Sequence, residues 1–513
     1  MNTWEDLQTA ALLGTDRRPL PTPQGSPAYR SATEALDRSD PARALLDLAA
    51  LETVRRRAAA PPDPAVERPE PAAPDARPAL PEAATRRLRL LLGDRGASSG
   101  ANLGELLPQW LTAARDRGYR APAALLPELL DAARARSELR PDAVTLAGPL
   151  GHWLADRNPD WRYVSRTVAE STTETTDQLW HEGLFAERVT HLTRLRRRDP
   201  AAALALLRST WAAERAEDRL LFLDTLQEGL GPADEEFLES ALTDRSKNVR
   251  AMAAELLSTL PGSALGARMA ERAGAAVRYG EGRLTVTPPT ECDAAMQRDG
   301  VPPKSPTGRG ERAWWFGEVI AATPLGHWQA GTGLTPERLL ALPVDGDWAE
   351  DLHEGWARAA VRQNDTDWAR ALLGAPPQSG KGRKERTAGA AAKLLAVLPP
   401  EERAAWTAAY IAGHGLGEAF QALGACAVPW TPPLSTAVVT ALQRAAASGS
   451  YPWSHSGVLG MTERALAPET APAVEQLADG AGPDSSWAET FTRLAGTLRF
   501  REAMLLELAG QAG

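Results

Sequence analysis

The sequence has very little cysteine. Its two cysteines, Cys292 and Cys426, lie far apart and lack the spacing of metal ligands, which argues against a secreted disulfide framework. The first residues, MNTWEDLQTAALLGTDRR, carry acids where a signal peptide needs bases, and they have no long apolar core. No uninterrupted apolar run approaches the length of a membrane span. We therefore expect a cytoplasmic protein that makes no membrane contact.

The sequence also lacks the short motifs of common enzyme classes. It contains no GxxxxGK[ST], no HExxH and no GxSxG. The stretch GHGLG at Gly413–Gly417 lacks the preceding strand and the third glycine of a dinucleotide fingerprint, and it predicts a turn between helices. The adjacent carboxylates of Asp234, Glu235 and Glu236 are predicted to be solvated in the first turn of a helix. We therefore assign no catalytic, cofactor-binding or metal-binding residue, and we expect no cofactor.

Histidine is scarce, but two of the seven histidines recur in matching heptapeptides. PLGHWLA contains His152 and PLGHWQA contains His327, and each is followed further along by HEG, at His181 and His353. This order indicates a related helical unit in two halves of the chain. Twin ligand or metal sites are the alternative, but zinc needs several nitrogen or sulfur ligands at short spacing, and neither histidine has them. We interpret both histidines as structural.

Acidic residues outnumber basic ones, 66 to 57, which gives a net charge of −9. This balance argues against general affinity for nucleic acid or anionic membranes. One short basic segment, Lys381–Arg386, is predicted to be a solvated loop. The sixteen tryptophans are mostly placed at helical spacing, so we expect them to fill a core and not to form a binding platform.

What the chain does contain is helical periodicity, which is clearest over Asp234–Pro261. From Val249, apolar residues follow at i+3, i+4, i+7, i+8 and i+11, and this stripe predicts an α-helix with Leu257 buried. A shorter apolar helix precedes it. Thr243–Lys247 is polar and short, so the two helices should fold back as an antiparallel pair. The pair resembles a HEAT repeat, with Asp244 in the turn.

Similar patterns along the chain predict an all-α fold, a HEAT-like α-solenoid of stacked helical hairpins. VRYGEGRLTVTP alternates around Gly280–Gly282 and predicts one small β-hairpin near 277–288. A segment rich in proline and alanine, PPDPAVERPEPAAPDARPALP, cannot pack a core and is predicted to be a linker. The predicted divisions are N-terminal helices at 1–57, the linker at 58–84, HEAT-like repeats at 85–276, the hairpin and loop insertion at 277–310, and C-terminal helical repeats at 311–513.

Three stretches resemble an uncharacterised bacterial family of unknown function. They begin RRRDPAAALALLRSTW (Arg196–Ala264), ALLGTDRRPLP (Ala11–Pro21) and GERAWWFGEVIAATPLGHW (Gly310–Trp328), and together the resemblance covers most of the chain. The resemblance implies a genomic neighbourhood, because members tend to be encoded near MoxR-type AAA+ ATPases, von Willebrand A domain proteins and SWIM zinc-finger proteins. It supplies no catalytic motif.

These observations lead us to expect a non-enzymatic scaffold or adaptor that binds another protein, with a MoxR-type AAA+ ATPase or a von Willebrand A protein as leading partner. The alternative is an enzyme of unknown class, with a site assembled in the fold from dispersed histidine, tryptophan and acidic residues. A pocket with a histidine and a carboxylate in hydrogen-bond reach would favour the enzyme. An extended surface without such groups would favour the scaffold.

Overall fold

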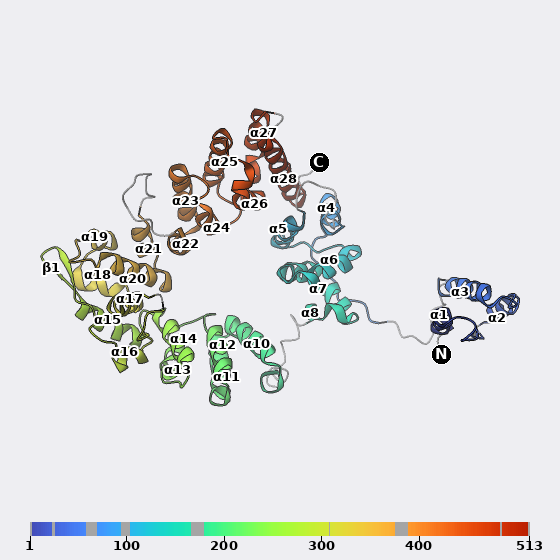
Figure 1. Ribbon diagram of the computed structural model, residues 1–513, viewed down its shortest axis with the longest axis horizontal. Helices are drawn as coiled ribbons and strands as arrows, with labels where there is room; N and C mark the ends of the chain where they lie inside the picture. The colour runs from blue at the N-terminus through green and yellow to red at the C-terminus, as the bar shows by residue number, and fades with distance from the viewer. Residues whose placement is uncertain are drawn as a thin grey trace. The chain divides into compact units, whose positions relative to one another are not determined.

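In a computed structural model the chain forms two compact units, Met1–Ala72 and Ala73–Gly513. The described residues are 3–22, 26–57, 69–93, 103–165, 179–306, 308–374, 388–482 and 485–510. Figure 1 shows that helices dominate both units.

The described residues of the first unit form three helices: α1 (Thr3–Leu13), α2 (Pro27–Glu34) and α3 (Pro41–Arg57). Ser26 caps α2 by accepting a hydrogen bond from the Tyr29 amide. The Tyr29 hydroxyl donates to the buried carboxylate of Glu52 at 2.7 Å. Burial raises the pKa of Tyr29 to about 12, and hydrogen bonds from Arg55 hold the pKa of Glu52 below its usual value. These contacts tie α2 to α3.

The second unit is a succession of short helices in which neighbours pack together, for example α10 with α11, α13 with α14, and α27 with α28 (Figure 1). The prediction of an all-α fold with a small β-hairpin is confirmed. Its α-helices are α4 (Glu82–Gly93), α5 (Leu103–Asp116), α6 (Leu126–Ala135), α7 (Arg140–Ala155), α8 (Arg162–Ser165), α10 (Phe185–Arg198), α11 (Pro200–Thr210), α12 (Ala216–Thr225), α13 (Glu235–Ala241), α14 (Lys247–Ser258), α15 (Ala264–Ala276), α16 (Ala294–Arg298), α17 (Glu311–Ala322), α18 (Gly326–Thr332), α19 (Pro336–Leu340), α20 (Ala349–Arg362), α21 (Thr366–Leu373), α22 (Ala388–Val397), α23 (Pro400–His414), α24 (Phe420–Gly424), α25 (Pro432–Ala447), α26 (Ser456–Ala465), α27 (Ala471–Gly480) and α28 (Ser486–Leu508).

The predicted β-hairpin is present, with β1 (Val277–Gly280) antiparallel to β2 (Arg283–Val286). Glu281 and Gly282 both have positive φ, 50° and 72°, as a two-residue turn between twisted strands requires. Leu284 extends the pairing, because its amide donates to the carbonyl of Pro343 at 2.9 Å. The hairpin is therefore attached to the segment between α19 and α20.

The helical pair predicted around Asp244 is also present, as α13 and α14. Leu257 is fully buried, as the apolar stripe predicts. The Asp244 carboxylate accepts from the Ser246 amide at 2.8 Å and pairs with Arg219 of α12. The turn residue therefore fixes the start of α14 and also connects this pair to the preceding helix.

The end of the predicted linker is part of the second unit. Residues 58–68 lie outside the described residues, but Ala79 forms a bridge with Arg120 and α4 already begins at Glu82. Arg77 donates from Nη1 to the carbonyl of Thr145 at 2.5 Å. This contact needs glycine at 148, where φ is 56° and a Cβ would lie 2.2 Å from Nη2 of Arg77. A proline-rich segment can therefore be held by one arginine and a backbone bridge.

Candidate functional site

The C-terminal helix α28 connects the last helices of the second unit to its first helices. Its N-terminal part packs through Trp487, Phe491 and Leu498 into a core with residues of α23–α27. Its C-terminal part contributes Met504 and Leu508 to a separate core with residues of α4–α8. Figure 1 shows α28 beside α4 and α5. We call this contact the seam.

Polar contacts at the seam are specific. Arg87 of α4 makes two hydrogen bonds to the Glu507 carboxylate, at 2.9 and 2.6 Å, and both side chains are mostly buried. The Arg87 guanidinium also lies over the ring of Phe500, 4.2 Å from its centroid. The Tyr119 hydroxyl donates to the carbonyl of Leu508 at 3.1 Å. The seam thus combines apolar burial with directional bonds.

Arg501 and Gln109 hold α5 to both α26 and α28. The buried Arg501 donates to Oε1 of Gln109 at 3.1 Å and to the carbonyl of Leu466 at 2.6 Å. Gln109 in turn donates to the carbonyl of Arg464 at 3.0 Å. Burial lowers the pKa of Arg501 to about 10, so this group remains charged at neutral pH.

A cleft of about 340 Å³ opens beside the seam. Its floor includes Gly457 and Gly460 of α26, which bring no side chain into the space. A Cβ on Gly457 would lie 3.0 Å from the ring of Phe420, whereas Gly460 faces open space. Four helices supply the lining: Glu105 and Leu106 from α5, Phe420 from α24, Ser456, Gly457, Gly460, Met461, Glu463 and Arg464 from α26, and Thr497 from α28.

The charges of the cleft lie at its edge. Glu463 forms an ion pair with Arg493, in which Oε1 of the carboxylate lies 3.5 Å from Nε of the guanidinium. Glu105 and Arg464 are exposed, and within the described ranges neither side chain has an ion-pair partner. Among the residues that line the cleft there are carboxylates but no histidine. The arrangement offers apolar area with opposite charges at the edge, which suits recognition better than acid–base chemistry.

Exposed aromatic side chains accompany the cleft. Phe420, in its wall, is 43% exposed. Tyr451 and Trp453 are 61% and 74% exposed and stack on one another, with centroids 6.2 Å apart. Trp453 lies in the turn Pro452–His455, which leads directly into α26. Exposed large apolar side chains that lie together, as Tyr451 and Trp453 do, are typical of contact surfaces, whereas single ones are common on any surface.

The structure does not bring the two matching histidines together. Each heptapeptide begins a helical segment where the preceding helix is interrupted. The first follows the kink at Gly148 within α7, and the second follows the end of α17 at Ala322. The first, with His152, packs into the core of α4–α8, whereas Trp328 beside His327 belongs to the core that runs from α10 to α22. Burial lowers the pKa of His327. In the part of the chain that the structure describes, no group of histidine, cysteine and acidic residues could hold a metal ion.

The tryptophans are mainly core residues, which confirms the prediction. The largest fully buried side chains include Trp110, Trp180, Trp356, Trp368 and Trp430. The HEG histidine His353 stacks on Trp356 at 5.6 Å, and Trp356 contacts Trp368 at 5.1 Å. The recurring His-Trp and HEG residues of the second half therefore belong to one aromatic core.

The prediction that Asp234 is solvated is wrong. Asp234 is 2% exposed and accepts two hydrogen bonds from the buried Arg196, at 2.8 and 2.9 Å. A short 3₁₀ turn, Pro232–Asp234, precedes α13 and directs this carboxylate inward, whereas Glu236 stays exposed. The sequence could not show this, because Arg196 lies on another helix and meets Asp234 only in the fold.

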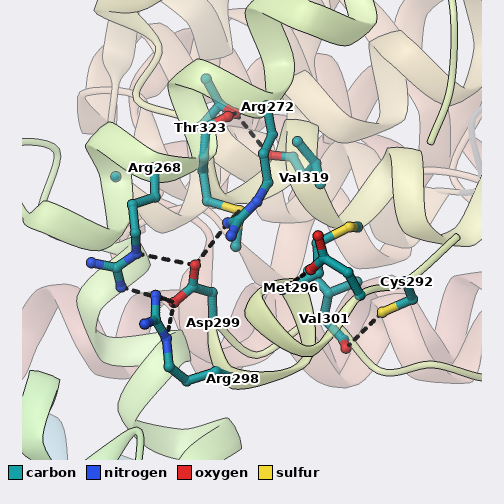
Figure 2. Close-up of polar contacts among 12 residues, drawn as sticks. Arg268, Arg272, Cys292, Met296, Arg298, Asp299, Val301, Val319 and Thr323 are labelled. Carbon is teal, nitrogen blue, oxygen red and sulfur yellow. Dashed lines mark hydrogen bonds and ion pairs between the residues drawn. The ribbon is translucent and has the colours of Figure 1, made fainter.

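A second buried carboxylate, Asp299, is surrounded by three arginines (Figure 2). Arg268 and Arg272 of α15 reach it at 2.9 and 2.7 Å, and Arg298 reaches it at 2.8 Å. Burial alone would raise the pKa of Asp299, but these hydrogen bonds hold it below its usual value. Arg268 also pairs with Glu239 of α13. The cluster therefore joins α13, α15 and the end of α16.

Beside its exposed face, α23 carries a row of stacked rings. Trp406, Tyr410 and His414 follow at four-residue spacing, with centroids 5.1 and 4.3 Å apart and nearly parallel planes. All three are half-buried, and the small residues Ala405 and Ala409 beside them are exposed. This row continues to the end of α23, where Gly415, with φ of 81°, begins the turn predicted from GHGLG.

Sequence reasoning assigned a binding role to none of the cleft residues; it placed Glu105 and Leu106 only in a helix. Glu105, Phe420 and Arg464 are far apart in the chain and follow no motif, so only the packing of α5 on α26 and α28 could reveal them. The basic segment Lys381–Arg386 lies outside the described residues.

Among the described helices, none is long and apolar enough to cross a membrane. Searches of curated proteins and of solved structures find no match for the chain. A family model does match it, over residues 6–508. The chain therefore belongs to a family of unknown function, DUF5691.

Proposed function

We propose that the protein is a non-enzymatic scaffold or adaptor, built of HEAT-like helical repeats, that binds another protein. Two kinds of observation support this proposal. Consecutive helices of the second unit pack as neighbours, as in a repeat array. The buried carboxylates of Asp234 and Asp299 accept several hydrogen bonds each and join successive helices, so these two groups stabilise the array and are not free to act as acid or base.

The outward face of α23 is the observation that carries the proposal. Ala405 and Ala409 are exposed and small, so a partner helix could approach the backbone of α23 closely. Trp406 and Tyr410 are stacked beside them and half-buried against the neighbouring cores, so part of each ring remains open to a partner. Aromatic side chains supply large contact area at low conformational cost and are enriched in protein interfaces.

The partner that we propose is a MoxR-type AAA+ ATPase or a von Willebrand A protein of a bacterial assembly in the cytoplasm. The resemblance of Arg196–Ala264 to its family supports the choice of partner, and the net charge of −9 favours a protein over nucleic acid. The two free cysteines, Cys292 and Cys426, are compatible with a reducing compartment.

The test mixes the purified chain with each partner and measures binding by titration calorimetry, with and without ATP. Ala409→Arg places a long charged side chain on the α23 face and should weaken binding about tenfold or more. Ala251→Arg, at an exposed position of α14, is the matched control and should leave binding unchanged. Both variants should melt like the unmodified chain, because both alanines are exposed. The proposal is contradicted if the chain binds neither partner. It is also contradicted if Ala409→Arg and Ala251→Arg weaken binding equally.

A further inference from the structure

We infer that the cleft beside the seam is half of a two-fold interface between two copies of this chain, in which each copy inserts Trp453 into the cleft of the other. The inference does not depend on the partner proposed above, since it concerns the chain alone. It rests on the exposure of Trp453, on the size and shape of the cleft, and on the charges around the cleft.

Trp453 is the clearest candidate for an anchor. It is 74% exposed, although tryptophan is largely buried elsewhere in the described chain. Its only described ring contact is with Tyr451, which is itself 61% exposed. An indole that remains in water forgoes a large apolar burial, and tryptophan is among the residues most enriched at the energetic centres of interfaces.

The cleft can receive one such side chain. Its volume, about 340 Å³, lies at the low end of the range of about 300–1,000 Å³ for ligand pockets, which suits one large side chain better than an extended ligand. Phe420 and Met461 offer an apolar wall. Gly460 leaves open space in the floor, because nothing lies within 4 Å of the position its Cβ would take.

The anchor directly precedes the cleft along the chain. Trp453 is three residues before Ser456, the first residue of α26 and part of the cleft lining. It does not line its own cleft. A two-fold interface uses the same patch on both copies, so this patch must contain both the inserted group and its receptor. The segment from Trp453 to Met461 meets this requirement.

The charges at the edge are self-complementary as well. Glu105 and Arg464 both line the cleft, are exposed, and have no ion-pair partner among the described residues. A two-fold axis can place Glu105 of each copy against Arg464 of the other, which forms two equivalent ion pairs. A heterologous partner would have to supply an apolar anchor and both charges, whereas a second copy of this chain carries all three.

Sedimentation velocity of the purified full chain across a concentration series tests the inference. The chain should form a dimer, and Trp453→Ala should raise its dissociation constant roughly thirtyfold or more, as expected for an interface anchor. The melting curve of the monomer should not change, because the ring is exposed. Leu221→Ala, at an exposed apolar position of α12, is the control and should leave dimerisation unchanged.

A charge exchange tests the pairing itself. Glu105→Arg and Arg464→Glu should each weaken the dimer, and the double variant should restore it because the two ion pairs are re-formed with reversed sign. If the chain is a monomer at every concentration, the inference is overturned, because no second copy then occupies the cleft. A dimer that is insensitive to Trp453→Ala, or a double variant weaker than both single variants, would also overturn it. None of these results involves the ATPase or von Willebrand A protein, so they are independent of the partner-binding test.

Discussion

Arg196 allows a sharp test of how the helical pairs are joined. Its side chain is fully buried and donates from Nε to the carbonyl of Glu228 at 2.9 Å. Its two terminal nitrogens donate to the Asp234 carboxylate and to the carbonyls of Pro200, Leu226 and Gly229. From its place on α10, one guanidinium thus bonds a carbonyl at the start of α11 and three carbonyls that follow the end of α12. We predict that this group holds three successive helices in register with α13.

Arg196→Met should destabilise the protein by about 3–5 kcal/mol, because it leaves the Asp234 charge buried without its partner and removes the donors of four carbonyls. This is a large part of the total stability of a typical domain, about 5–15 kcal/mol. The next residue provides the control. Arg197 pairs with Glu228 at 2.6 Å, but the two side chains are 64% and 40% exposed. Arg197→Met should therefore cost no more than about 1 kcal/mol.

Urea unfolding gives the free energies, and hydrogen exchange locates the loss. Because a long helical array can unfold in parts, a single midpoint is insufficient, and exchange in α10–α13 is the direct measurement. Arg196→Met should increase exchange there while α23–α28 keep their protection. Asp234→Asn should also destabilise, and the double variant should lose less than the sum of the single variants. If Arg196→Met and Arg197→Met behave alike, the buried network does not join these helices and the reasoning fails.

Three further predictions follow from the same structure. Leu257→Ala should cost about 2–5 kcal/mol, measured by urea unfolding, since the side chain is fully buried; an unchanged midpoint would mean that this stripe is not core. Asp299 has a lowered pKa, so its carboxylate should stabilise the fold above the unfolded pKa of about 3.9 and lose this contribution as the pH falls through the folded pKa; Asp299→Asn should remove the corresponding fall of stability below about pH 4, measured by urea unfolding at a series of pH values. Limited proteolysis should separate the two units before Ala73, because Arg77 attaches the following segment to the second unit; first cleavage within 73–81 would contradict this attachment.

The predictions that held come from local rules. The stripe from Val249 specifies α14 because side chains three and four residues apart lie on one helical face, and burial of Leu257 follows from it. The hairpin follows from the alternating residue pattern of the two strands and from the turn between them, whose residues Glu281 and Gly282 take positive φ. Such features need only a few neighbouring residues, so the sequence alone reveals them.

The features that sequence reasoning missed depend on partners distant in the chain. Asp234 looked like a solvated acid of a helix's first turn, and only the approach of Arg196 on α10 makes it a buried ion pair. Arg77 looked like part of an extended linker, and only the kink at Gly148 provides its place. In each case the sequence shows the side chain but not what faces it.

The sequence by itself determined the helical class, the hairpin and the apolar faces, because these depend on spacing along the chain. Only the tertiary structure decided that α28 returns to α4 and α5, where Arg87 meets Glu507, and that a cleft forms beside this contact. The cleft is lined by Glu105 and by Arg464, which are hundreds of residues apart and adjacent only because helices from both ends of the second unit pack together. The periodicity of the sequence cannot predict this contact, because the contact depends on how all the helices between the two ends pack on one another.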